Sequence, residues 1–207
     1  MKAAGRTKIK QPKGQGTTHL KSRFRRRTSN LKRWAFIALG SNMGDRERIL
    51  LEAMTQLQRN SDEILLRSSL WETAPVDCPP GSPPFLNAVV ALGPRPNETP
   101  ESLFAKLQAL EKDFGRKPKT VLNEPRPLDL DLIAFGNETR SGKALTLPHA
   151  RANLRRFVLE PMSEIASDFL LPGQSKTVSQ LLRALPAETT MRKFKEIKYR
   201  GIVKRAL

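Results

Sequence analysis

Two carboxylates in residues 128–132 are the groups of this chain with the clearest chemical use. Asp129 and Asp131 alternate with leucines at 128, 130 and 132, which is the period of a strand buried on one side. Both carboxylates should therefore point to one strand face, ~6.6 Å apart along the backbone. Like charges this close repel unless water or a cation separates them. The pattern fits either a solvated strand face or a Mg²⁺ site, because Mg²⁺ binds one or two carboxylates and completes its shell with water and phosphate oxygens.

Side chains suited to phosphate and to flat rings accompany the carboxylates. Arg126 precedes them and has the fork geometry that holds a phosphate through two hydrogen bonds. Phe85 offers a ring face, and Asn87 lies on the same face of its strand, where an amide would bind a ring edge. The remaining candidates are Arg116, Lys117, Lys119, His149, Arg155, Arg156 and Phe157. Each alone is also typical of a core aromatic or a solvated surface, but together they indicate phosphoryl transfer between a nucleotide and a heterocycle.

Two common ways of binding ATP are absent from the sequence. The chain has no Gly-x-x-x-x-Gly-Lys-Ser/Thr loop, whose backbone amides would cradle phosphates. It also lacks the glycine-rich loop and the His-Arg-Asp motif of protein kinases. A nucleotide site in this chain must therefore consist of side-chain cations and metal.

Hydrophobic periodicity predicts the elements that position these residues. The predicted strands cover residues 34–40, 63–73, 85–92 and 128–135. Helices are predicted after the N-caps Asp45 and Thr99, and the chain from His149 to about residue 185 is predicted as helical pieces that Pro161, Pro172 and Gly173 interrupt. The order strand, helix, strand, strand, helix, strand predicts an α+β fold. It is the ferredoxin-like α/β sandwich, with helices on one face of an antiparallel sheet and helical pieces at the C-terminus.

The net charge of +17 is concentrated at the two ends of the 207-residue chain. Residues 1–33 hold 12 Lys and Arg and no acid, and residues 191–207 carry +6, so residues 34–190 have a net charge of −1. We therefore expect a basic disordered extension at 1–33, one domain at 34–190 and a basic tail at 191–207. Arms of this kind could bind nucleic acid through counterion release, and a solvated tail fits the same pattern.

Cysteine content and hydropathy limit the cellular compartments that are compatible with this sequence. Cys78 is the single cysteine, which excludes a disulfide framework within the chain and fits a reducing compartment. The sequence has neither an apolar run of ~20 residues that would cross a bilayer nor the apolar stretch of a secretory signal. We therefore expect the protein to be located in the cytoplasm. The Arg-rich, acid-free N-terminus is equally compatible with an organellar transit peptide, a bacterial basic extension or a start codon assigned too early.

Five short motifs resemble one enzyme family. They are Phe36-Ile-Ala-Leu-Gly-Ser-Asn42, Phe85-Leu-Asn87, Gly115-Arg116, Pro125-Arg-Pro-Leu-Asp-Leu-Asp131 and Leu147-Pro-His149 followed by Arg155 and Phe157. From about Trp34 to Leu182 the chain is similar to 6-hydroxymethyl-7,8-dihydropterin pyrophosphokinase. The resemblance implies a transferase that moves the terminal pyrophosphate of ATP to the hydroxymethyl group of 6-hydroxymethyl-7,8-dihydropterin in folate biosynthesis, with AMP as the second product. It also implies the ferredoxin-like fold.

The resemblance implies a role for each matching residue. Asp129 and Asp131 would hold two Mg²⁺ ions, and Arg116 and Arg126 would contact the transferred phosphates. The implied ATP-binding residues are Gln108, Glu111, Lys119, His149 and Arg155. The implied pterin-binding residues are Phe85 and Phe157, which would sandwich the ring, and Asn87, Thr73 and Val76, which would bind its edge. The partners are thus ATP and the pterin, and we expect a monomer without a membrane partner.

Three positions depart from the family pattern, and one other function class remains as an alternative. The family often has an aromatic residue near Asn123, in a loop that closes over the site, and some members have arginines at the positions of Pro118 and Leu122. The alternative is a ferredoxin-like RNA-binding module that uses the basic tails. That class predicts a Lys/Arg-Gly-Phe/Tyr-Gly/Ala-Phe-Val signature on a central strand, which the sequence lacks.

Overall fold

The structure is a computed structural model that describes residues 33–118, 121, 123–187 and 189–197. The basic extension predicted at 1–33 therefore lies outside the described residues, apart from Arg33, and so does the segment 198–207 of the predicted tail. The strands are β1 (Ala35–Ser41), β2 (Leu66–Arg67), β3 (Leu70–Thr73), β4 (Phe85–Leu92), β5 (Asp129–Phe135), β6 (Arg140–Ser141), β7 (Thr146–Leu147) and β8 (Arg192–Lys195). The helices are α2 (Arg46–Gln58), α3 (Pro100–Asp113), the 3₁₀ turn η2 (Ala152–Leu154), α4 (Arg156–Ala166) and α5 (Val178–Ala184).

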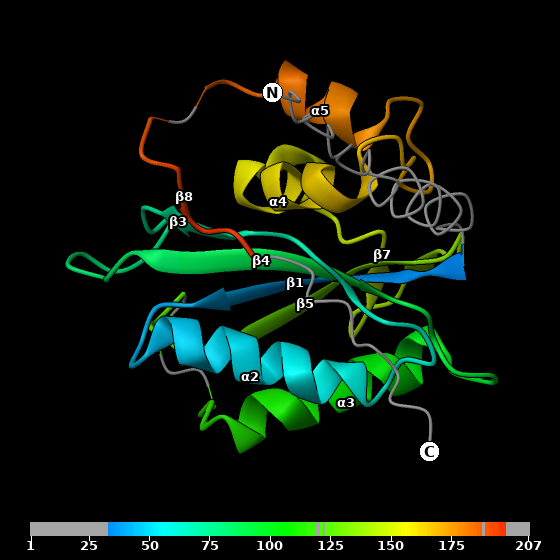
Figure 1. The fold of residues 1–207 in the computed structure, drawn as a ribbon, viewed down its shortest axis with the longest axis horizontal. Helices are drawn as coiled ribbons and strands as arrows, with labels where there is room; N and C mark the ends of the chain where they lie inside the picture. The colour runs from blue at the N-terminus through cyan, green and yellow to red at the C-terminus, as the bar shows by residue number, and fades with distance from the viewer. Residues whose placement is uncertain (1–32, 119–120, 122, 188, 198–207) are drawn as a thin grey trace, which may run out of the picture. The chain divides into compact units, whose positions relative to one another are not determined.

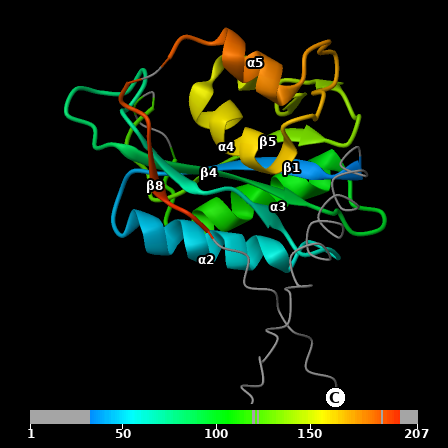
Figure 2. The same cartoon turned by 45° about the horizontal axis from the view of Figure 1, so that its top comes forward.

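An antiparallel sheet forms the middle layer of the described domain. Its strand order is β5-β1-β4-β3-β8, and β2 also pairs with β4. Helices α2 and α3 cover one face of the sheet, and α4 and α5 cover the other (Figures 1 and 2). The predicted ferredoxin-like α/β sandwich with an antiparallel sheet is thus confirmed, and the C-terminal helical pieces form the second helical layer.

The expectation that helices cover only one sheet face is wrong, because the central strands are apolar on both faces. Along β1, Ile37 and Leu39 belong to the core beneath α2 and α3, whereas Phe36 belongs to the core beneath α4 and α5. All eight residues of β4 are buried, which is the mark of a strand covered on both sides. Burial of this second apolar face requires α4 and α5.

Local signals placed the two N-terminal helices correctly. Asp45 caps α2, and its side chain accepts a hydrogen bond from the amide of Arg48 at 3.1 Å. Thr99 and Ser102 form a capping box at the start of α3, where Pro100 lies in the first turn. Both caps satisfy backbone N–H groups that the helix itself leaves without partners.

Two predicted boundaries are wrong, and tertiary contacts explain both. The strand predicted at 63–73 is split into β2 and β3. The split occurs because Ser68 Oγ accepts a hydrogen bond from the amide of Val89, and the carboxylate of Glu164 on α4 accepts one from the amide of Ser69. Pro161 does not interrupt the helix, since α4 runs through it. The buried apolar stripe of α4, which includes Val158 and Met162, offsets the ~3 kcal/mol that an interior proline costs.

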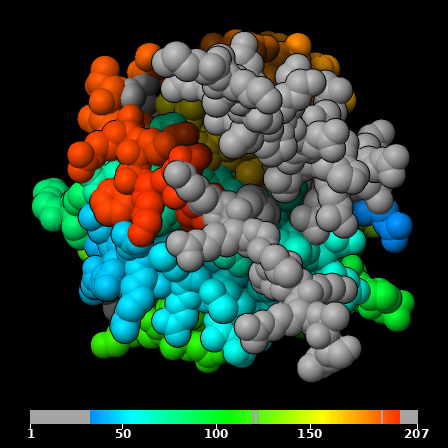
Figure 3. Space-filling model, in the orientation of Figure 1, coloured from blue at the N-terminus to red at the C-terminus, as the bar shows by residue number. Residues whose placement is uncertain are grey.

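The edge strand β8 lies beyond residue 190, where the domain was expected to end. It pairs with β3, and Arg192, Lys193 and Lys195 each form an ion pair with an acid of the domain. Figure 3 shows β8 in red at the surface, above α2 in cyan. These three basic residues of the predicted tail are therefore neutralised within the fold. No helix among the described residues is both long and apolar enough to span a bilayer.

Candidate active site

The candidate site lies on the α4 face of the sheet, where three adjacent strands bring their functional residues into register. In β1, Gly40 is the cross-strand neighbour of Asn87 in β4 and of Asp129 in β5. A Cβ atom on Gly40 would lie 3.3 Å from Asn87 Oδ1, 3.6 Å from the Phe85 ring and 3.8 Å from Asp129 Cβ. The absence of a side chain at Gly40 therefore keeps open the space between the ring-binding candidates and the carboxylates.

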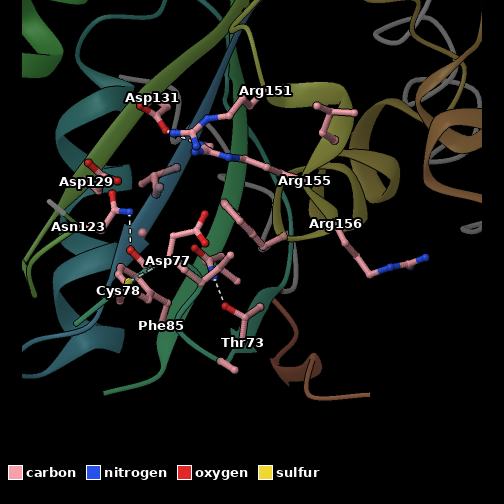
Figure 4. A pocket seen from close by; sticks show the side chains of 18 of the residues that line it. Thr73, Asp77, Cys78, Phe85, Asn123, Asp129, Asp131, Arg151, Arg155 and Arg156 are labelled. Carbon is pink, nitrogen blue, oxygen red and sulfur yellow. Dashed lines mark hydrogen bonds and ion pairs between the residues drawn. The ribbon is translucent and has the colours of Figure 1, made fainter. Parts of the chain in front are cut away.

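A cavity of about 500 Å³ opens at this point of the sheet. Its walls come from β4, β5, the loop after β3 and the start of α4 (Figure 4). The predicted site residues that line it are Thr73, Val76, Phe85, Asn87, Arg126, Asp129, Asp131, Arg155, Arg156 and Phe157. The cavity thus joins the ring-binding candidates, the carboxylate pair and three of the arginines that the sequence offered as phosphate-binding candidates.

The two carboxylates share a strand face, as their alternation predicts, but their surroundings differ. Asp129 is held by two guanidinium groups, with Arg116 Nη1 at 2.7 Å from Oδ1 and Arg126 Nη2 at 2.7 Å from Oδ2. Asp131 has looser partners, since Arg155 Nη1 is 3.7 Å and His149 Nε2 is 4.0 Å from its Oδ2. Burial, followed by the negative charge of Asp129, raises the pKa of Asp131 above the usual aspartate range.

Because the pKa of Asp131 is raised, we expect Asp131→Asn to stabilise the ligand-free protein at neutral pH. The stability that the wild-type side chain contributes is present at low pH and is lost as the pH rises through the raised pKa. The amide of the variant does not titrate, so its advantage in melting temperature should be largest near pH 7 and should shrink toward pH 4. The gain should be modest because 36% of the Asp131 side chain is exposed. Thermal unfolding from pH 4 to pH 8 measures it, and an equal or lower melting temperature at pH 7 would contradict the expectation.

His149 is oriented toward Asp131 by its neighbours. Its backbone N–H donates to the carbonyl of Ile133 at 2.9 Å, and its Nδ1 accepts from the amide of Arg151 at 3.3 Å. Burial, with the positive charges of Arg155 and Arg151, lowers the pKa of His149, so the imidazole is neutral at pH 7. Since Nδ1 accepts, the proton of the neutral ring lies on Nε2, which faces Asp131.

The other residues that were predicted to bind the nucleotide do not share one environment. Glu111 is buried, and its carboxylate holds Arg116 and accepts the amide of Leu130 in β5 at 2.7 Å. Burial raises the pKa of Glu111. Arg116 lines a second cavity of about 450 Å³, which shares Arg126 with the first. Gln108 is exposed on α3 and lines neither cavity, and Lys119 lies outside the described residues.

Arg156 has a structural role that differs from the phosphate contact predicted for it. Its guanidinium donates to the carbonyl oxygens of Leu182, Leu185 and Pro186 at 3.0–3.3 Å, and Nη1 pairs with Glu160. It therefore closes the C-terminal end of α5, where carbonyl groups lack partners within the helix. Figure 4 shows its side chain pointing away from the carboxylates.

Sequence reasoning missed Asn42 as a positioning residue. Its side chain is buried, with Oδ1 accepting the amide of Arg126 at 2.8 Å and Nδ2 donating to the carbonyl of Pro83 at 3.4 Å. Its own amide donates to the carbonyl of Arg126 at 3.2 Å. Asn42 thus connects the loop before β4 with the arginine that holds Asp129. The local signal is a polar residue directly after a buried strand, which also fits an ordinary turn.

The ring-binding candidates form the other side of the cavity. Asn87 Nδ2 donates to Thr73 Oγ1 at 2.8 Å, which fixes the orientation of the amide. The guanidinium of Arg126 lies 5.3 Å from the centre of the Phe85 ring, and that of Arg155 lies 5.3 Å from the centre of the Phe157 ring. Each aromatic residue is therefore stacked on an arginine of the carboxylate side.

A hydrogen bond joins two loops at the cavity. Asn123 Nδ2 donates to the carbonyl of Asp77 at 2.6 Å, and both residues line the cavity. Both residues also have left-handed backbone conformations, with φ of 55° and 53°. Asparagine adopts this conformation more readily than an aromatic residue does. The polar residue that departs from the family pattern therefore makes a defined contact between the loops.

We expect Asn123→Gly to weaken pterin binding about fivefold. Glycine accepts the left-handed conformation but removes the amide, so the change isolates one hydrogen bond of about 1 kcal/mol. Asn97→Gly is the matched control, because Asn97 also has a positive φ, of 65°, and lies outside the cavity. Calorimetric titration with the pterin measures the effect. Unchanged affinity in Asn123→Gly would show that the loop contact does not support the binding site.

The residues present fit a divalent metal that phosphate oxygens also coordinate. Among the described residues, no group of three or more His, Cys, Asp and Glu side chains is arranged to hold a metal alone. Asp129 and Asp131 provide carboxylate oxygens on one face, and each oxygen has two lone pairs, so an arginine contact leaves room for a metal. An open pair of this kind suits Mg²⁺, which keeps water and phosphate oxygens in its shell.

Comparison with known proteins shows which family the chain resembles in sequence. Residues 36–167 match the family described as 7,8-dihydro-6-hydroxymethylpterin-pyrophosphokinase (HPPK). A Haemophilus influenzae protein named 2-amino-4-hydroxy-6-hydroxymethyldihydropteridine pyrophosphokinase is 34% identical over 152 residues, which are 72% of this chain and 91% of that protein. The Arabidopsis thaliana "Folate synthesis bifunctional protein, mitochondrial" is 39% identical over 133 residues, which are 62% of this chain and 23% of that protein.

Solved structures show the same fold at lower identity. The crystal structure of wild-type Plasmodium falciparum HPPK-DHPS with SDX-DHP superimposes with a TM-score of 0.58 at 12% identity, and covers 72% of this chain and 44% of that chain. The chain spans less than a quarter of several curated relatives that it matches. The family match covers most of the chain and contains both the carboxylate pair and the ring-binding residues. The chain belongs to the HPPK family.

Proposed function

We propose that this chain transfers the terminal pyrophosphate of ATP to the hydroxymethyl group of 6-hydroxymethyl-7,8-dihydropterin, as a pyrophosphokinase of folate biosynthesis. The observation that carries this proposal is the register at Gly40, which puts a ring slot and a carboxylate pair in one cavity. In the reaction the pterin hydroxyl oxygen forms a bond to the β-phosphorus, and the bond from that phosphorus to the α–β bridging oxygen breaks. AMP leaves and the hydroxyl proton passes to solvent, since a loose transition state makes little demand on a general base.

The pterin is assigned to the ring slot. Phe85 and Phe157 line the cavity and stack on the flat ring, and Asn87 binds the ring edge through its fixed amide. Thr73 holds that amide in place, and the backbone near Val76 supplies further edge contacts. This placement fixes the hydroxymethyl group relative to the carboxylates, and such positioning lowers the activation free energy of the transfer.

The polyphosphate is assigned to the carboxylate side of the cavity. Two Mg²⁺ ions held by Asp129 and Asp131 would neutralise charge on the phosphates when bound. Arg116, Arg126 and Arg155 supply fixed positive charge, and His149 donates from Nε2. Gln108 and Lys119 remain proposals from family resemblance alone. Glu111 contributes by holding Arg116 and the backbone of β5.

The RNA-binding alternative has no support in the described residues. A ferredoxin-like sheet that binds RNA exposes aromatic residues on an open face. Here helices cover both faces, and the basic residues of β8 are neutralised by ion pairs. A role in nucleic-acid binding for residues 1–32 and 198–207 stays a prediction, as do the compartment and the monomeric state.

The decisive experiment measures AMP release from ATP by the purified chain. AMP should appear only when both Mg²⁺ and 6-hydroxymethyl-7,8-dihydropterin are present, in equal amount to the pterin diphosphate. Release of ADP in place of AMP, or AMP release that does not depend on the pterin, would overturn the proposed reaction.

A further inference from the structure

Arg151 is a cation in the cavity that no step above uses. It lines the cavity, and its residue is exposed. Among the residues that the structure describes, no hydrogen bond or ion pair engages its guanidinium, whereas the other cavity-lining arginines Arg126, Arg155 and Arg156 each contact a carboxylate. Figure 4 shows Arg151 and Arg155 extending toward the same carboxylate, Asp131.

The backbone of Arg151 makes two hydrogen bonds within the described part of the chain, whereas its guanidinium makes none there. Its amide donates to His149 Nδ1 at 3.3 Å, and its carbonyl accepts from the amide of Leu154 at 3.2 Å. Arg151 thus begins η2, between the two residues that approach Asp131. The side chain therefore extends from an ordered anchor into the cavity, rather than from a loop with no defined position.

The basic groups around Asp131 favour the binding of an anion that carries several negative charges. Arg155 and His149 approach this one carboxylate at distances longer than a hydrogen bond, and Arg151 adds a third basic group on the same side. After burial, the positive charge of Arg151 is the largest cause that lowers the pKa of Arg155, so these two guanidinium groups repel each other. Divalent metal on the carboxylates would add further positive charge. A triphosphate, with about four negative charges, would neutralise such a cluster.

We propose that Arg151 is a further nucleotide-binding residue, which contacts the polyphosphate of ATP from the α4 side of the cavity. This inference rests on the proposed function, because it concerns the nucleotide of that reaction. Arg151 would contact the phosphates and not the base, so it should contribute more to the binding affinity for ATP, with its full polyphosphate, than to that for AMP. A solvated surface arginine, the simpler alternative, would contribute to the binding of neither nucleotide.

The test compares nucleotide affinity among variants by calorimetry, with Mg²⁺ and a nonhydrolysable ATP analogue. Arg151→Ala should weaken binding of the analogue about tenfold or more, as expected for a hydrogen bond between charged groups. Binding of AMP should weaken less, and Arg151→Lys should recover part of the loss. Arg151→Gln, which keeps the length of the side chain, serves as a second neutral variant. Arg183→Ala is the matched control, since it removes the same charge from an exposed position outside both cavities.

The outcomes separate the inference from the proposed function. If the wild-type chain binds the analogue and both neutral variants bind it equally well, Arg151 is a surface residue and the inference is overturned while the function stands. Equal losses in Arg151→Ala and Arg183→Ala would also overturn it, because they would reflect net charge alone. If the wild-type chain binds no nucleotide, the proposed function fails and the inference fails with it.

Discussion

Replacing Asp131 with alanine should lower the rate of AMP release on the order of 10³-fold or more. The proposed metal ions need carboxylate ligands, and loss of one ligand removes several kcal/mol of stabilisation from the transition state. Asp131 is the more informative target of the pair. Asp129 also pairs with Arg116 and Arg126, so its removal would change two arginine contacts as well as metal binding, whereas the partners of Asp131 lie 3.7 Å and 4.0 Å away.

The measurement is single-turnover AMP release at saturating Mg²⁺ and substrates, so that slow product release does not hide the chemical step. Asp168→Ala is the control, because Asp168 is an exposed aspartate outside both cavities. Asp131→Asn should lose activity to a similar extent while gaining stability at neutral pH. Turnover near the wild-type rate in Asp131→Ala would remove the carboxylate pair from the mechanism, whatever the stability of the variant.

Loss of activity together with a gain of stability is the pattern expected of a site that awaits a cation. The raised pKa of Asp131 shows that the ligand-free fold disfavours its charge, even with Arg155 and His149 nearby. A structural ion pair would have the opposite effect, because a favourable partner lowers the pKa of an aspartate. The same carboxylate would therefore cost stability in the free chain and provide the binding energy for metal and polyphosphate.

Sequence patterns predicted the parts of the site that depend on strand periodicity and on local capping. Alternation alone placed Asp129 and Asp131 on one face and their leucine neighbours on the other, because side chains alternate along any strand. The spacing of Phe85 and Asn87 placed both on one face for the same reason. Asp45 and Thr99 were found because capping acts within three residues.

Features that depend on contacts distant in sequence were missed or wrong. Arg151 and Arg156 are alike in sequence, yet Arg156 binds carbonyls some 26–30 residues away and Arg151 faces the cavity. The role of Asn42 depends on Pro83 and Arg126, which the chain brings together only when β1, β4 and β5 pair. The split of the strand predicted at 63–73 depends on Glu164 of α4. None of these contacts leaves a periodic signal, and the one local signal, a polar residue after a buried strand at Asn42, fits an ordinary turn as well.

The second large effect is expected at Phe85, where loss of the aromatic ring should weaken pterin binding by roughly 1–3 kcal/mol, as for a base stacked on an aromatic side chain. Phe85 lines the cavity, and the guanidinium of Arg126 lies 5.3 Å from the centre of its ring. Phe85 is also only 8% exposed, so it contributes to packing as well. A truncation to alanine would therefore change stability and binding together.

Phe85→Leu separates the two contributions, because leucine keeps most of the buried apolar volume but has no flat π face. We expect this variant to retain most of its thermal stability and to lose most of the affinity that stacking provides. Phe104→Leu is the control, since Phe104 packs against the core beneath α2 and α3 and does not line the cavity. Pterin titration by calorimetry, with melting temperatures for each variant, distinguishes the cases. If Phe85→Leu binds the pterin as tightly as the wild type does, Phe85 is a core residue and the ring slot must be sought at Phe157.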